Sequence, residues 1–208
     1  MLKNIFSKSF FGIDDSGELV KFVEVLKNGK SIKIGRFGCG VLPENIKKKG
    51  NYPVSINQEG QVLANVLINK VDDENYLIIE INKVRTYMHF VVNGKSVSSI
   101  TLDIGESEIV QGIEWLSKFR DEVQRQFIYW HTNKYADNTE RPKIKKIILC
   151  GDGAKVPNIA EYLSVGIRQK VELANIWTNF NLPHGHIPEM SFIDSLGYAK
   201  AVGLALSK

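Results

Sequence analysis

Short apolar runs separated by polar turns occupy the N-terminal part of the chain. The run 10–14 ends in Asp14, and the apolar segments 19–26 and 31–42 follow it on either side of Asn28-Gly29. Val, Ile and Phe favour strands, and Asn-Gly suits a two-residue type I′ hairpin because both turn positions need positive φ. The pattern therefore predicts an antiparallel meander of three strands.

The same arrangement recurs later in the chain. The run 76–80 ends in Glu80, and the segments 86–92 and 96–102 lie on either side of Asn93-Gly94. The Asn-Gly dipeptides recur after 65 positions and the terminal acids after 66, so both spacing and order repeat. The repeat indicates two related halves that direct their acids toward one shared place.

Helical periodicity follows each meander. Residues 58–69 carry apolar side chains at helical spacing, and within residues 109–130 an apolar side chain recurs every three or four positions. The rest of the chain is predicted to contain a strand at 146–150, a glycine turn at 151–154, a helix at 159–167, a short strand at 171–173 and a last helix from about Ser191 to Ser207.

This order of elements predicts an α/β fold with mixed sheets. In the second unit, an antiparallel meander precedes alternating helices and strands, which is typical of a sheet extended by parallel strands with helices on its faces. The first unit offers only a meander and one helix. We therefore expect two domains, an abridged one at residues 1–75 and a nearly complete one at residues 76–208.

Composition is ordinary for a soluble globular protein, with 43% hydrophobic and 24% charged residues. No apolar run reaches the roughly 20 residues of a membrane-spanning helix. Cys39 and Cys150 lie in apolar contexts without paired spacing, which favours buried free thiols over a disulfide or a metal site. Free thiols fit a reducing compartment, so we expect a cytoplasmic protein.

The formal net charge of +4 is mild but unevenly placed. Lysines cluster at residues 47–49 and again at residues 143–146. Such clusters are either solvated loops or contacts for an acidic partner or an anionic membrane surface. Aromatic residues are not interleaved with these lysines, which argues against nucleic acid binding.

Three turns that follow strands are candidate ligand sites, at residues 14–17, 80–83 and 151–154. At such places in α/β sheets, backbone N–H groups and helix N-termini point toward an anion. Asp14 and Glu80 are candidate metal-associated acids. Strand-end carboxylates kept only as turn residues explain them equally well.

Four segments resemble the type IV pilus assembly protein PilM, an actin-like relative of the cell-division protein FtsA. Residues 12–25 resemble the opening and first phosphate turn of that family, and residues 80–86 resemble its second phosphate turn. Residues 148–159 and 198–206 resemble its adenosine turn and closing helix. The resemblance runs through nearly the whole chain in the family's order, and it implies an actin-like, ribonuclease-H-like fold.

The resemblance also implies a nucleotide site, with ATP and Mg²⁺ as cofactors. The residues that match the three turns are Asp14, Ser16, Gly17, Glu80, Asn82, Lys83, Thr86, Gly151, Gly153 and Ala154. The two acids Asp14 and Glu80 would hold the metal through water.

Several of these positions depart from the family pattern. Ser16, Asn82 and Asp152 stand where relatives have glycine, and Glu80 replaces an aspartate. Side chains at these turns obstruct the approach of backbone N–H groups to phosphate. The inserted subdomain of relatives would fall between residues 69 and 76, where this chain is short. We therefore expect a degenerate nucleotide site, and no residue is assigned as catalytic.

The function that the resemblance implies is that of a scaffold in type IV pilus assembly or a related secretion machine. Such a protein would lie at the cytoplasmic face of the inner membrane. Its partner would be the cytoplasmic tail of a PilN-like membrane protein or another pilus assembly protein.

Two alternatives stay open. The first is a Mg²⁺-dependent actin-like ATPase or ribonuclease-H-like nuclease that uses Asp14 and Glu80 with Asp103 or Asp152. The second is an FtsA-like division protein. No amphipathic membrane helix follows Lys208, which counts against this second alternative.

Overall fold

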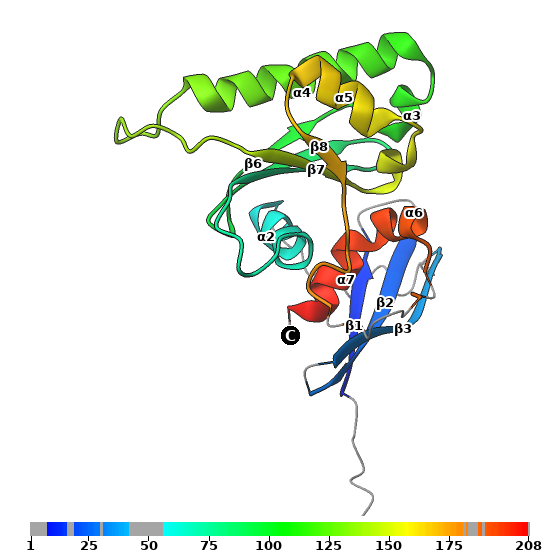
Figure 1. The fold of residues 1–208 in the computed structure, drawn as a ribbon. Helices are drawn as coiled ribbons and strands as arrows, with labels where there is room; N and C mark the ends of the chain where they lie inside the picture. The colour runs from blue at the N-terminus through cyan, green and yellow to red at the C-terminus, as the bar shows by residue number, and fades with distance from the viewer. Residues whose placement is uncertain are drawn as a thin grey trace, which may run out of the picture.

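The computed structural model describes residues 8–15, 19–29, 31–41, 56–180, 182, 187–188 and 190–207. Within these residues the chain forms two β-sheets that are joined and covered by helices (Figure 1). The predicted site residues Ser16 and Gly17 and the lysine cluster at 47–49 lie outside the described residues.

The first sheet is an antiparallel meander, as the sequence predicts. Its strands, in spatial order, are β1 (Lys8–Asp14), β2 (Val20–Asn28) and β3 (Ser31–Gly40). The prediction that Asn28 and Gly29 form the turn is wrong by one residue, because Asn28 pairs with Ser31 and is the last residue of β2. Gly29, at φ +58°, is therefore the first residue of the turn.

The second sheet is mixed. Its strands, in spatial order, are β6 (Lys95–Leu102), β5 (Thr86–Val92), β4 (Tyr76–Ile81), β7 (Lys146–Cys150) and β8 (Val171–Leu173). β4, β5 and β6 are antiparallel neighbours, whereas β7 and β8 are added in parallel. Asn93 and Gly94, both at positive φ, form the turn between β5 and β6. The prediction of a mixed sheet is confirmed.

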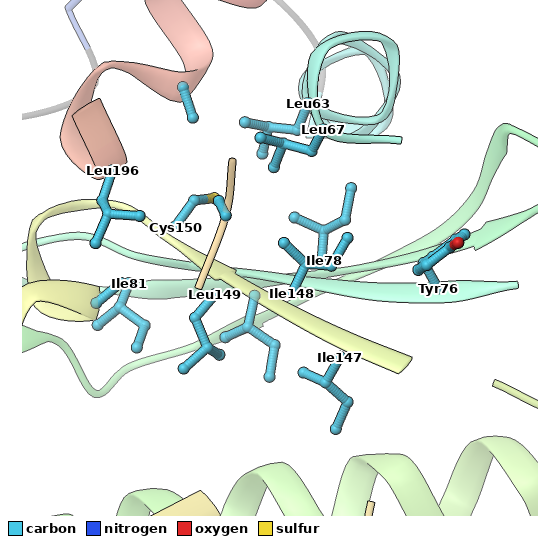
Figure 2. Close-up of a cluster of buried hydrophobic side chains, with 14 of the residues drawn as sticks. Leu63, Leu67, Tyr76, Ile78, Ile81, Ile147, Ile148, Leu149, Cys150 and Leu196 are labelled. Atoms are coloured by element: carbon cyan, nitrogen blue, oxygen red, sulfur yellow. The ribbon is translucent and has the colours of Figure 1, made fainter. Parts of the chain in front are cut away.

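Helices cover both faces of the second sheet. α4 (Ile113–Thr132) and α5 (Ile159–Ile167) lie on one face and α2 (Ile56–Leu67) lies on the other (Figure 1). Figure 2 shows Leu63 and Leu67 of α2 on one side of the sheet, with Ile147 and Leu149 of β7 on the opposite side. The central strands are apolar at nearly every position because both of their faces are buried. Each fully buried Leu or Ile side chain contributes about 1.5–3 kcal/mol to stability.

The last helix, α7 (Ala199–Leu206), packs between the first sheet and α2 (Figure 1). A methyl group at Gly12 of β1 would overlap the carbonyl oxygen of Ala201, and one at Gly203 would lie 2.6 Å from Val62 of α2. The small residues of α7 therefore allow its backbone to approach β1 and α2 closely. The domain boundary between residues 75 and 76 stays a prediction. Helices of each half pack on the sheet of the other, since α2 packs on β5 and β6 and α7 packs on β1 and β2.

Two predicted helices are interrupted in the structure. The predicted helix 109–130 is divided into α3 (Glu106–Ile109) and α4, because Gly112 at φ +139° is not helical. The predicted last helix is divided into α6 (Phe192–Ser195), a 3₁₀ turn η2 (Leu196–Tyr198) and α7. The Leu196 carbonyl accepts a hydrogen bond from the N–H of Gly151 at 2.9 Å, so this segment bends toward the third turn instead of continuing one helix.

The two cysteines have different environments. Cys150 is buried in β7, as expected, whereas the prediction that Cys39 is buried is wrong. Cys39 is exposed because it lies near the end of β3 and lines a cavity. In the described part of the chain, no helix combines the length and apolarity that a bilayer span requires.

Candidate functional site

A cavity of about 490 Å³ lies where the three predicted turns approach one another. Asp14 at the end of β1 and Asn82 and Lys83 after β4 line it, and Asp152 contributes from η1 (Asp152–Lys155). The predicted site residues Asp14, Asn82 and Lys83 therefore line the same cavity as Asp152 of the third turn. Leu19, Phe37 and Met190 are among the apolar residues that complete the lining.

Other predicted site residues face the protein interior. Thr86 is fully buried and donates its hydroxyl hydrogen to the carbonyl oxygen of Ile104, at 2.8 Å. Gly151 has φ +87°, and a methyl group at Gly153 would collide with the Ile81 side chain. Ala154 is buried in the same core. The glycine turn therefore has a packing reason for its small residues that does not involve a ligand.

The second turn is bonded to the beginning of α3. The carbonyl oxygens of Asn82 and Lys83 accept hydrogen bonds from the N–H groups of Glu106 and Ser107, both at 2.9 Å. The Asn82 N–H in turn donates to the Arg85 carbonyl at 3.0 Å. The backbone of this turn is thus largely engaged in capping a short helix.

An ion pair joins the two sides of the cavity. Lys21 of β2 pairs with Asp152, which also pairs with Lys155 at 2.9 Å. Burial alone would raise the pKa of Asp152, but the hydrogen bonds from Lys21 and Lys155 outweigh it, and the pKa lies below its usual range. The first sheet is thereby fixed to the third turn by a charged contact. The sequence patterns did not single out Lys21, although its position opposite Asp14 in the β1–β2 register directs it to the same face.

A second charged cluster lies behind the cavity, around Lys200 of α7. Lys200 is only 4% exposed, and its Nζ lies 3.0 Å from Glu80 Oε1 and 3.5 Å from Glu59 Oε1. Asp14, itself buried, also interacts electrostatically with this ammonium group. One cation therefore faces three carboxylates that come from β1, α2 and β4.

Burial and charge act in opposite directions on Lys200. Burial would lower its pKa, but the carboxylates of Glu80, Asp14 and Glu59 raise the pKa above its usual range, so Lys200 stays protonated. Burial raises the pKa of Glu80 to about 7, against the lowering effect of Lys200. The Oε2 atom of Glu80 is buried without a hydrogen-bond partner among the described residues.

The side chains around this cluster are buried. His89 of β5 is fully buried, and its burial lowers its pKa to about 3, so the ring is neutral. Burial also raises the pKa of the Cys150 thiol well above its usual range. Lys200 and Glu59 were not singled out from the sequence. The only signal was a lysine placed among the small and apolar residues of the last helix.

We expect Glu80→Gln to flatten the pH dependence of stability. An acid whose pKa is raised from 4.5 to about 7 on folding stabilises the folded state fully below about pH 4.5, and that contribution is lost as the pH rises through 7. Between pH 5 and 7.5 the wild type should therefore lose roughly 2 kcal/mol more than the variant. Urea unfolding at the two pH values measures this difference. The exposed control Glu114→Gln on α4 should keep the wild-type slope, and an unchanged slope in Glu80→Gln would contradict the assignment.

Only two acids of the nuclease alternative lie together, since Asp14 and Glu80 both interact with Lys200. Asp103 is exposed and pairs with Arg85 at 3.0 Å, whereas Asp152 is held by Lys21 and Lys155. With Lys200 lying among Asp14, Glu59 and Glu80, no group of three or more His, Cys, Asp or Glu side chains among the described residues is arranged to hold a metal ion.

The sequence matches no protein-family model and no curated protein. Solved structures do match. A chain of the PilM-PilN type IV pilus biogenesis complex superposes with a TM-score of 0.69 at 10% identity, covering 96% of this chain and 98% of that one. This chain has an actin-like fold. The confirmed fold class includes the abridged first half and the nearly complete second half that the repeat predicts.

Two further structures support the actin-like fold. The ethanolamine utilization protein EutJ of Carboxydothermus hydrogenoformans has a TM-score of 0.52 at 11% identity, over 99% of this chain and 92% of its own. The activator of 2-hydroxyisocaproyl-CoA dehydratase from Clostridium difficile, with bound ADPNP, has a TM-score of 0.53 at 11% identity, over 96% and 94%. At these identities the likeness establishes the fold.

Proposed function

We propose that this actin-like protein is a scaffold of type IV pilus assembly, or of a related secretion machine, that binds the cytoplasmic tail of a PilN-like membrane protein. Its place would be the cytoplasmic face of the inner membrane. The structural likeness to a chain of the PilM-PilN type IV pilus biogenesis complex supports a role in this kind of machine. The observation that carries the binding role is a cluster of exposed apolar side chains on one face of the first sheet, beside the Glu24–Arg36 ion pair.

That face belongs to β1 and β2. Ile13 pairs with Phe22 across the two strands, so both side chains lie on one face, and Phe11 lies on it two residues earlier. Phe11, Ile13 and Phe22 are 43%, 57% and 37% exposed. The opposite face carries Gly12 and is covered by α7. A cluster of exposed apolar side chains on a sheet is typical of a protein interaction site.

The edge of β1 suits the same partner. β1 is the last strand of its sheet, and among the described strands only β2 pairs with it. An extended peptide can add to such an edge by main-chain hydrogen bonds while its alternate side chains cover the apolar face. We propose that the tail binds in this way, beside β1 and over Phe11 and Ile13.

The nucleotide site is degenerate in this proposal. The cavity is lined by four carboxylates, Asp14, Glu106, Asp152 and Asp194, and by three lysines, Lys21, Lys83 and Lys155. Two of these lysines are already paired with Asp152. Asp14 and Glu80, the acids that would hold Mg²⁺, already interact with Lys200, so the described residues do not fit a magnesium polyphosphate. The cavity then serves the structure, and the protein would work without ATP hydrolysis.

A second candidate is a protein whose partner binding depends on a nucleotide in the same cavity. One observation favours it. The Nδ2 atom of Asn82 is buried without a hydrogen-bond partner among the described residues, and Asn82 lines the cavity. A phosphate or ribose oxygen could accept this hydrogen bond. Titration with ATP separates the two candidates.

We expect Ile13→Lys to weaken binding of the tail at least tenfold. The substitution places a charge in the apolar face without affecting the buried side of β1. Fluorescence anisotropy with a labelled peptide of a PilN-like cytoplasmic tail measures the dissociation constant. Val165→Lys, at an exposed position of α5, is the matched control and should bind as the wild type does. No binding by the wild type, or equal binding by Ile13→Lys, would contradict the proposal.

A further inference from the structure

We propose that the ammonium group of Lys200 is a built-in replacement for a divalent cation, and that shortening this side chain converts the acids around it into a divalent-cation site. The inference rests on the degenerate site of the proposed function and is independent of the tail. It concerns the buried cluster of Asp14, Glu59, Glu80 and Lys200.

The cluster needs a cation. Its carboxylates come from the end of β1, from α2 and from β4, and Asp14 and Glu80 are each less than 10% exposed. Carboxylates so placed repel one another strongly when water is excluded, because charges interact more strongly at low dielectric constant. A positive charge among them offsets this repulsion, and Lys200 supplies it at 3.0 Å from Glu80 and 3.5 Å from Glu59.

Lysine satisfies the acids incompletely. The Oε2 atom of Glu80 is buried and has no hydrogen-bond partner among the described residues. An ammonium group offers only three donors, whereas Mg²⁺ or Mn²⁺ takes about six oxygen ligands and completes its shell with water. The orphaned carboxylate oxygen is therefore a ligand that a metal ion could use and that Lys200 leaves unused.

Lys200 links the two halves of the fold. Lys200 belongs to α7, which packs on the first sheet, while Glu80 and Glu59 belong to the second sheet and the helix on it. The charged contact is covalently part of the chain, so it does not depend on a bound ligand. It holds the two halves in one arrangement, as a scaffold requires.

Metal rescue of Lys200→Ala tests the inference. Thermal unfolding is followed with EDTA and with MgCl₂ or MnCl₂. The melting temperature of the variant should rise by about 5–10 °C when the free metal exceeds its dissociation constant a hundredfold, because the metal binds only the folded state. The wild type should not respond. Adding Glu80→Gln to the variant should abolish the response, since it removes the carboxylate with the free oxygen.

A second variant covers the case in which Lys200→Ala does not fold. Lys200→Ala with Glu59→Gln carries one negative charge fewer and keeps Asp14 and Glu80, so it should fold and still respond to metal. If neither variant gains stability from Mg²⁺ or Mn²⁺, or if the wild type gains as much, the inference is wrong. Tail binding by the wild type is measured separately, so a failure here is distinct from a failure of the proposed function.

Discussion

Replacing Lys200 with methionine is expected to lower the free energy of unfolding by about 3–5 kcal/mol. The variant keeps the volume of the side chain but leaves the Glu80 carboxylate, which is 3.0 Å from Nζ in the wild type, without its cation. Removing the cation is costly because the buried carboxylates that remain either stay charged without compensation or have to take up protons. Guanidinium chloride unfolding at neutral pH measures the loss.

The matched control is Lys118→Met on α4. Lys118 forms an exposed i,i+4 pair with Glu114, and such pairs contribute only about 0.3–0.5 kcal/mol. Combining Lys200→Met with Glu80→Gln should recover part of the lost stability, because the buried charge is then removed as well. Equal effects of Lys200→Met and Lys118→Met would show that the buried cluster does not stabilise the fold.

Gly12→Ala is expected to destabilise the protein by about 3 kcal/mol or more, at the upper end of the range for overpacking. A methyl group at this position would overlap the Ala201 carbonyl oxygen and lie 2.7 Å from the Ala205 backbone nitrogen. These are backbone atoms of α7, so a change of rotamer cannot relieve the contact and the helix has to move away from β1. Chemical unfolding measures the effect.

Gly40→Ala on β3 is the control for this substitution. A methyl group at Gly40 meets nothing within 4 Å, and its backbone is not in the left-handed region. Its effect should stay within about 0.5 kcal/mol of zero or be slightly stabilising, because alanine reduces the entropy of the unfolded chain. A mild Gly12→Ala variant would contradict the close packing of α7 on the first sheet.

Strands were the most predictable part of this fold. Continuous apolar runs such as 76–81 and 146–150 have few alternatives to a buried strand, and the repeat indicated that 76–81 begins a meander. The ends of helices were less predictable. Gly112 and the segment 196–198 interrupt predicted helices because tertiary hydrogen bonds and a positive φ, which periodicity does not reveal, decide the local backbone.

The site could be predicted only in outline. Asp14 and Glu80 were recognised from their places at strand ends, and both interact with the same buried lysine. Lys200 lies 120 positions after Glu80 in the chain, and the bend before α7 brings the two together. No local pattern records such a contact. The roles of the predicted site residues in ligand binding stay predictions.

Titration with ATP tests most directly whether this actin-like protein works as a scaffold without nucleotide. Thermal unfolding of the wild type is followed at rising ATP up to millimolar concentration, with and without Mg²⁺. Lys200 among the acids and the Lys21–Asp152 pair across the cavity predict no change in the melting temperature. A ligand of the folded state at a hundredfold excess over its dissociation constant would raise it by about 5–10 °C. A rise of that size, dependent on Mg²⁺, would contradict the account.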